Sequence, residues 1–173
     1  MPKKILANRE SIIKVTNDII KSENYENLNC RYIANKAGIG LGTIYHFFKS
    51  KDEILAYILL DDWKLQLKSI KLNCPILEGV KNIYNGLMAF SKKYHSLWEY
   101  TKKFSNEYTS YLSKHSILVN QISALLIDLY KFNEEKFLQD EIEFIAEMIL
   151  IYATRLYDYS RMEKIFIKII GGK

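Results

Sequence analysis

The fold of the N-terminal part of the chain is decided by the stretch Ala34-Asn35-Lys36-Ala37-Gly38-Ile39-Gly40-Leu41-Gly42-Thr43-Ile44-Tyr45. Three glycines within five residues separate two short segments whose apolar residues follow helical spacing. Gly38 suits a left-handed residue just after a helix, because glycine pays no steric penalty there. The stretch therefore predicts two short helices, about residues 29–36 and 41–48, joined by a tight turn.

The sequence on both sides of this stretch carries further helix signals. Residues 6–23 predict one amphipathic helix. Its apolar residues recur at spacings of three and four: Ile12, Val15, Ile19 and Ile20. Asn29 is a good N-cap for the helix at 29–36, since its side chain accepts from an orphan N–H. Ser50 predicts the N-cap of a fourth helix, about residues 51–72, with two acidic residues in its first turn.

The rest of the chain is also helical by pattern. Pro75 disfavours helix in the residue before it and suits the first turn of the next helix, so we expect a domain boundary there. The expected helices span residues 75–90, 97–104, 107–130, 137–158 and 160–170. The sequence therefore predicts an all-α fold: an N-terminal three-helix helix-turn-helix domain (1–50), a connecting fourth helix (51–72), and a helical-bundle domain (75–173) for ligand binding and dimerisation.

Composition narrows the function classes. The net charge of +5 is compatible with nucleic acid as a partner, but a lysine-rich composition weakens that signal. The two cysteines, Cys30 and Cys74, have no metal-ligand spacing, and the chain has no nucleophile elbow, P-loop or zinc-protease motif. We therefore expect no enzyme activity, no cofactor and no metal. No apolar run is long enough to span a bilayer, so we expect a cytoplasmic protein without membrane contact.

The run from Ile33 to Leu55 resembles the signature of the TetR/AcrR family of transcriptional regulators. The matching features are an Ile-Ala pair, the glycine-bearing turn, Gly42-Thr43-Ile44-Tyr45, an aromatic-rich end, and Ser-Lys-Asp-Glu-Ile-Leu. The resemblance implies a DNA-reading second helix whose N-terminal end enters the major groove. The expected DNA-binding set is Asn29, Arg31, Leu41, Gly42, Thr43, Tyr45, His46, Lys49 and Lys51.

The resemblance also implies roles within this set. Thr43 and Tyr45 donate hydroxyl hydrogen bonds to phosphates, and Lys51 pairs with a phosphate at the start of the fourth helix. Arg31 reaches a guanine edge, while Gly42 lets the backbone approach the DNA closely.

Four positions depart from the family pattern. Gly40 stands where a serine commonly caps the reading helix, so that cap is weaker. Leu28, Leu41 and Phe47 replace polar residues that are frequent in the family. These changes remove polar contacts, and Leu41 shifts the expected readout toward thymine methyl groups.

The C-terminal region is rich in aromatic residues at helical spacing. Such residues usually fill a core, whereas a pocket between bundle helices is the functional alternative. The expected pocket residues are Tyr84, Leu87, Trp98, Phe104, Tyr108, Tyr111 and Tyr152. Residues 137–170 are expected to form a homodimer, because 144–153 is apolar on most sides and 160–170 carries an apolar stripe.

Together these features predict a dimeric repressor that a small apolar or amphipathic effector releases from a palindromic operator on double-stranded DNA. Two alternatives remain open. One is a constitutive or architectural DNA-binding dimer without a ligand, which a solid C-terminal core favours. The other is a helical module that recruits another protein, which an exposed apolar patch beyond the dimer surface favours.

Overall fold

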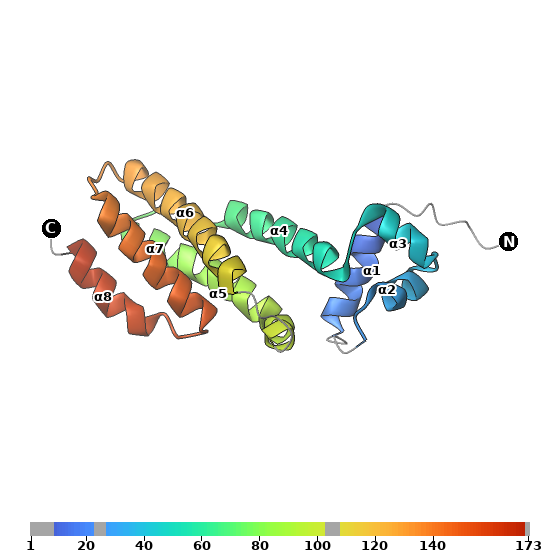
Figure 1. The fold of residues 1–173 in the computed structure, drawn as a ribbon. Helices are drawn as coiled ribbons and strands as arrows, with labels where there is room; N and C mark the ends of the chain where they lie inside the picture. The colour runs from blue at the N-terminus through green and yellow to red at the C-terminus, as the bar shows by residue number, and fades with distance from the viewer. Residues whose placement is uncertain (1–8, 23–26, 103–107, 172–173) are drawn as a thin grey trace. The chain divides into compact units, whose positions relative to one another are not determined.

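The computed structural model describes residues 9–22, 27–102 and 108–171, together with their side chains except those of 100–102, 108–114 and 169–171. All regular structure in these ranges is helical (Figure 1). The helices are α1 (Arg9–Lys21), α2 (Cys30–Ala37), α3 (Leu41–Phe47), α4 (Lys51–Ser69), α5 (Ile76–Lys102), α6 (Tyr108–Phe132), α7 (Gln139–Thr154) and α8 (Ser160–Gly171). The expected all-α fold is confirmed.

One expected helix break is wrong. The sequence predicts separate helices at 75–90 and 97–104, but α5 runs without interruption from Ile76 to Lys102. The intervening segment 91–96 is largely polar, yet it contains neither glycine nor proline. Ser91, Tyr94 and Leu97 are buried there, so they continue the apolar stripe of α5 at helical spacing.

The helix expected at 137–158 is shorter than predicted, because α7 ends at Thr154. Leu156 adopts a left-handed conformation, with φ of 56°, and the Tyr157 N–H donates to the Tyr152 carbonyl across the turn. This is the hydrogen-bond pattern of a helix C-terminus, here without the usual glycine. Asp158 then accepts from the Ser160 N–H at 2.9 Å, which fixes the start of α8.

The chain divides into two compact units. The N-terminal unit comprises Met1–Leu65 with Ser96–Lys103, and the C-terminal unit comprises Gln66–His95 with Phe104–Lys173. The functional boundary near residue 75 stays a prediction, since this division follows packing and not function.

The N-terminal unit has a small core made by α1 to α4. Ile12, Ile33, Ile44 and Ile54, one residue from each of these helices, are completely buried. Burial of side chains of this size is worth about 2 kcal/mol each, which stabilises a unit of short helices. The sides of these helices that do not face the core are available for contact with solvent or with a partner.

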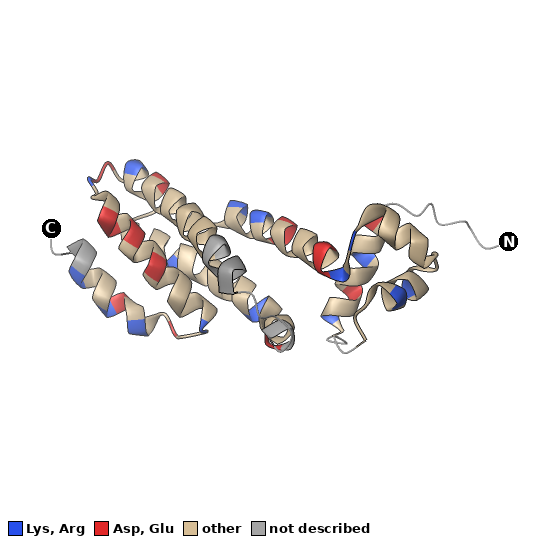
Figure 2. Cartoon of the chain, viewed as in Figure 1, with Lys and Arg blue, Asp and Glu red and all other residues tan. Residues whose placement is uncertain are grey.

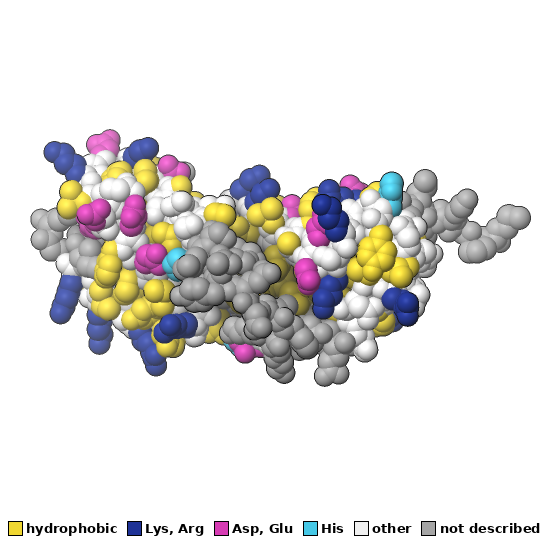
Figure 3. Space-filling view, viewed as in Figure 1, with side chains coloured by type: hydrophobic (Ala, Val, Ile, Leu, Met, Phe, Trp, Pro, Cys, Tyr) yellow, Lys and Arg dark blue, Asp and Glu magenta, His cyan; other side chains and the backbone are white. Residues whose placement is uncertain are grey.

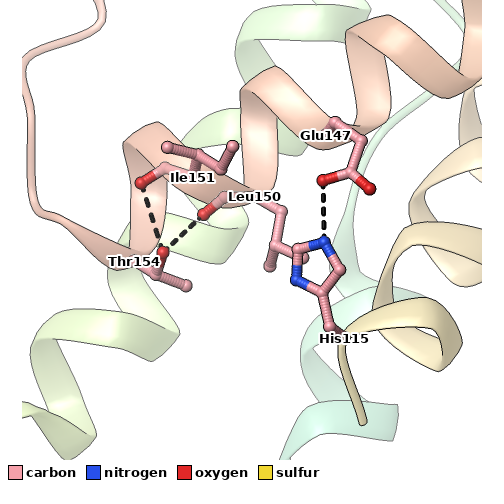
Figure 4. A network of polar contacts seen from close by, with 5 residues as sticks. All are labelled: His115, Glu147, Leu150, Ile151 and Thr154. Atoms are coloured by element: carbon pink, nitrogen blue, oxygen red, sulfur yellow. Dashed lines mark hydrogen bonds and ion pairs between the residues drawn. The ribbon is translucent and has the colours of Figure 1, made fainter. Parts of the chain in front are cut away.

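The C-terminal unit is a bundle of α5 to α8. Its centre is filled by apolar side chains from all four helices, among them Ile83, Leu87, Ile122, Leu126, Ile145, Ile149, Met162 and Phe166. His115 Nε2 of α6 lies 2.8 Å from Glu147 Oε2 of α7, and the Thr154 hydroxyl donates to the Leu150 carbonyl at 2.7 Å (Figure 4). Among the described helices, none is both long and apolar enough to cross a membrane.

Candidate nucleic-acid interface

The turn between α2 and α3 has the geometry that the sequence predicts. Gly38 has φ of 66°, and its N–H reaches the Ala34 and Asn35 carbonyls, which ends α2 in a left-handed turn. Asn29 caps the other end of α2: its Oδ1 accepts from the Tyr32 N–H at 2.9 Å. Because this cap uses the oxygen, an Asn29 contact with phosphate would come from its amide nitrogen.

The α3 helix has one buried side and one exposed side. Ile44 is buried completely, and Phe48, just after the helix, is 1% exposed. Gly42, Tyr45 and His46 are exposed, at the spacing i, i+3 and i+4 that brings residues to one face of a helix. Lys49 is also exposed and follows the extended residue Phe48, just after α3. Leu41 and Thr43 are half-buried at the helix start. The structure therefore gathers six of the nine expected DNA-binding residues on or beside α3.

Gly40 is the N-cap residue of α3 and provides no side-chain cap, as expected because glycine has no hydroxyl. The Thr43 N–H donates to the Gly40 carbonyl at 2.9 Å, so the first turn closes through the backbone alone. The remaining N-terminal N–H groups of this short helix are thereby less screened by protein than those of a capped helix.

The start of α4, unlike that of α3, is stabilised by side-chain hydrogen bonds. The Glu53 N–H donates to Ser50 Oγ at 3.2 Å, while the Glu53 carboxylate accepts from the Lys49 N–H at 2.6 Å. This reciprocal arrangement is close to a capping box and fixes the backbone between Lys49 and Lys51. The expected phosphate-binding lysine, Lys51, is the first residue of α4 and is half-buried.

Cys30 connects all three helices of this region. Burial raises the pKa of its thiol, and hydrogen bonding with the Tyr45 side chain and the Lys51 backbone offsets part of that rise. Cys30 is 8% exposed, so it acts as a packed structural residue. Its partner Tyr45 is 55% exposed, so this contact links the buried thiol to the exposed side of α3.

Arg31 is the second residue of α2, and its side chain is exposed, as a base-reading role requires. Figure 2 shows basic residues on α2 and at the start of α4. Arg9 is a further basic residue, which the sequence pattern does not single out: its guanidinium lies 4.9 Å from the Phe48 ring centroid and 4.4 Å from that of Tyr57. This stacking ties the beginning of α1 to the α3–α4 junction.

Four of the seven expected ligand-binding residues have described side chains, and a common pocket for the seven stays a prediction. Tyr84 and Leu87 are 1% and 2% exposed in the core of the C-terminal unit, and the Tyr84 hydroxyl donates to the Tyr157 carbonyl. Tyr152 is half-buried with its ring 5.4 Å from that of Tyr157. Trp98 is half-buried but belongs to the N-terminal unit. Phe104 and the side chains of Tyr108 and Tyr111 lie outside the described residues.

Comparisons with known proteins agree with this geometry. The family described as "Bacterial regulatory proteins, tetR family" matches residues 12–58, which run from α1 into α4. An HTH-type transcriptional regulator of Staphylococcus aureus (strain MRSA252) is 23% identical over 163 residues, 92% of this chain and 85% of that protein. Another, from S. aureus (strain bovine RF122 / ET3-1), is 34% identical over 74 residues, 41% of this chain and 40% of that protein.

A solved structure shares the whole fold. The fatty acid degradation regulator FadR from Bacillus halodurans is 21% identical, with a TM-score of 0.58 and 98% of each chain covered. At this identity the likeness establishes the fold, in which an N-terminal helix-turn-helix precedes a helical domain. The family match over residues 12–58 and the similar HTH-type regulators show that α1 to α4 carry the DNA-binding helix-turn-helix of the tetR family of bacterial regulatory proteins.

Proposed function

We propose that the chain is a repressor that binds a palindromic operator as a homodimer and is released by a small apolar or amphipathic ligand. The observation that carries the DNA-binding part is the exposed face of α3 with Gly42, Tyr45 and His46, together with exposed Lys49 just after α3 and exposed Arg31 on α2. A ligand would act by binding more tightly to the conformation whose two reading helices do not fit the operator.

The proposed DNA contacts fall into two kinds. Arg31 has an exposed guanidinium and reads a base edge, where a bidentate pair to guanine is the commonest direct contact. Lys49, Lys51, Thr43 and Tyr45 anchor phosphates, and Leu41 packs against a thymine methyl. His46, whose ring meets Phe47 edge-on at 4.9 Å, adds a donor at the exposed end of α3.

The experiment is to select an operator from a random-sequence pool at low salt and to compare two variants on it. Arg31→Ala should lose about 1–3 kcal/mol of binding and relax the preference at one operator position. Lys51→Ala should weaken binding to all sequences alike and lower the salt slope by about one unit. Equal losses for Arg31→Ala on operator and random DNA would contradict its reading role. No binding by the native protein to any sequence would overturn the proposal.

The proposed homodimer uses α7 and α8, within the expected range 137–170. Phe144 and Ile151 of α7 are 53% and 38% exposed, and Ile165 and Ile167 of α8 are 38% and 49% exposed. Large apolar side chains at this exposure on neighbouring helices are typical of an interface between subunits. Ile169 and Ile170, which the sequence also assigns to it, have side chains outside the described residues.

The proposed ligand site lies in the C-terminal domain. Its support is the shared fold with a protein whose name identifies it as a fatty acid degradation regulator, together with the aromatic content of α5 to α7. Mass spectrometry under native conditions should find a small molecule that co-purifies with the protein. A panel of fatty acids should raise its melting temperature and weaken operator binding.

The full burial of Tyr84 and Leu87 favours a second candidate function, a DNA-binding dimer that takes no ligand. This candidate predicts that no compound of the panel changes the melting temperature or the operator affinity. The two candidates share the α3 interface and differ only in that result.

A further inference from the structure

The surfaces of α7 and α8 carry opposite charges. Between Gln139 and Thr154, α7 contains four acidic residues and no basic one. Asp140, Glu143 and Glu147 fall at the spacing i, i+3 and i+7, which forms a continuous strip along a helix. The exposed basic residues of α8, Arg161, Lys164 and Lys168, repeat the same spacing. We call these the acidic strip and the basic strip.

The two strips flank a band of exposed apolar side chains. That band contains Phe144 and Ile151 of α7 and Ile165 of α8. Figure 3 shows hydrophobic side chains between acidic residues over α7 and basic residues along α8. A two-fold axis that runs along this band would place α7 of one subunit over α8 of the other, so each acidic strip would meet a basic strip.

Three of these six charged residues have no side-chain partner within the described part of the chain. Among the described residues, Asp140, Lys164 and Lys168 form no ion pair or hydrogen bond with another side chain. Glu143 accepts a hydrogen bond from the amide of exposed Gln139, at 3.2 Å. Glu147 is held by His115, and the Arg161 guanidinium lies 5.0 Å from the Tyr157 ring centroid. Asp140 complements the dipole of α7 at its first turn, whereas Glu143 and Glu147 extend the strip beyond that turn.

We propose that this face binds the same face of a second copy of the chain, with the acidic strip of each α7 paired to the basic strip of the partner's α8. The inference rests on the homodimer of the proposed function and adds the orientation of the helices within it. An axis across the band, in contrast, would place like charges against each other, which is unfavourable for association. The strips therefore select one of the two orientations and reject the other.

The test uses two full-length chains with reversed strips. The first carries Lys164→Glu and Lys168→Glu, so both of its strips are acidic. The second carries Asp140→Lys and Glu143→Lys, so both are basic. Each variant alone should dimerise about tenfold more weakly than the native protein, or worse, in analytical ultracentrifugation. An equimolar mixture should form a heterodimer of near-native affinity, because both of its contacts then pair opposite charges.

The matched control is Lys64→Glu with Lys68→Glu on α4, which removes the same charges from exposed residues at the same i, i+4 spacing. This control should dimerise like the native protein, and circular dichroism should show that all variants keep their helices. If either charge-reversed variant still forms a homodimer of native affinity, the proposed pairing of acidic and basic strips is wrong. The pairing is also wrong if both variants are monomeric and do not form a heterodimer when mixed. Operator binding by the native protein is measured separately, so this result and that of the proposed function can be told apart.

Discussion

Gly38 and Gly42 of the helix-turn-helix serve different purposes: Gly38 is needed for the backbone conformation of the turn, and Gly42 is expected to be needed for DNA binding. Gly38 has φ of 66°, a conformation that costs other residues about 1 kcal/mol or more, whereas an added Cβ on Gly42 would meet nothing within 4 Å. Gly42→Ala should therefore keep or raise the free energy of unfolding, by up to about 1 kcal/mol, yet weaken DNA binding because the methyl group blocks close approach of the backbone. Gly38→Ala should lower stability. Urea denaturation and operator titration measure both effects, and unchanged operator affinity in Gly42→Ala would contradict the close approach.

Tyr130 makes stability sensitive to alkaline pH. Burial, then the charges of Glu141 and Glu135, raises its pKa to about 12. Its folded pKa lies above the unfolded value near 10, so its contribution to stability is complete below pH 10 and is lost as pH rises toward 12. The free energy of unfolding can fall by about 3 kcal/mol, since a shift of one pKa unit corresponds to about 1.4 kcal/mol.

Tyr130→Phe should remove this part of the alkaline destabilisation. The Tyr130 hydroxyl is buried without a hydrogen-bond partner in the described part of the chain, so its removal should leave stability at neutral pH unchanged or higher. Urea denaturation of both proteins at pH 9 and pH 11.5 gives the comparison. A variant that loses as much stability as the native protein between these pH values would assign the effect to other groups.

At the scale of helices, the sequence predicts those helix ends that are set by residues nearby in the chain. The bounds of α2 and α3 follow from Asn29, Gly38 and Gly40, all within a dozen residues, and the structure differs from the prediction by one residue at most. The continuity of α5 is not predictable in the same way. It depends on burial of Ser91 and Tyr94 by the rest of the bundle, which outweighs the polar character of the segment around them.

The candidate site also contains some features that local sequence predicts and others that depend on contacts between distant residues. Residues from Asn29 to Lys51 form one local motif, so their types and spacing alone predict the caps, the left-handed turn and the exposed side of α3. Arg9 and its stacking on Phe48 and Tyr57 join positions 39 and 48 residues apart. No periodicity of the chain encodes such a pair, and the α7–α8 face likewise depends on which sides the bundle leaves exposed.

The approach of α5 to α6 depends on one glycine. An added Cβ on Gly79 would overlap the Cδ1 and Cδ2 atoms of Leu129, which is itself completely buried. Gly79→Ala should lower the free energy of unfolding by about 1–3 kcal/mol, because the packed leucine has little room to move.

Leu129→Ala in the same chain should relieve this overlap. The double variant should then be more stable than the sum of the two single changes predicts, by about 0.5 kcal/mol or more in a double-mutant cycle. Additive losses would show that α5 accommodates the methyl group by shifting as a whole and not by pressing on Leu129.

At the scale of the whole molecule, the affinity for operator DNA is expected to depend on dimerisation. A monomer carries a single α3 face, whereas a dimer on a palindrome engages two and neutralises about twice as many phosphates. The salt dependence of binding counts those phosphates, because each neutralised phosphate releases counterions in proportion. The slope of log affinity against log salt therefore reports, from binding measurements alone, the number of subunits on the operator.

Phe144→Glu is the variant that separates the two states. It places a charge in the apolar band of α7 at a residue that is 53% exposed, so the monomer should stay folded while the dimer dissociates. Phe132→Glu is the matched control, since Phe132 is also 53% exposed but belongs to α6 and not to the band on α7 and α8. On the selected palindrome, Phe144→Glu should bind with about half the native salt slope, and Phe132→Glu with the native slope. A full slope for a variant that ultracentrifugation shows to be monomeric would mean that DNA itself assembles the dimer, and that the α7–α8 face is not needed to bring two subunits to the operator.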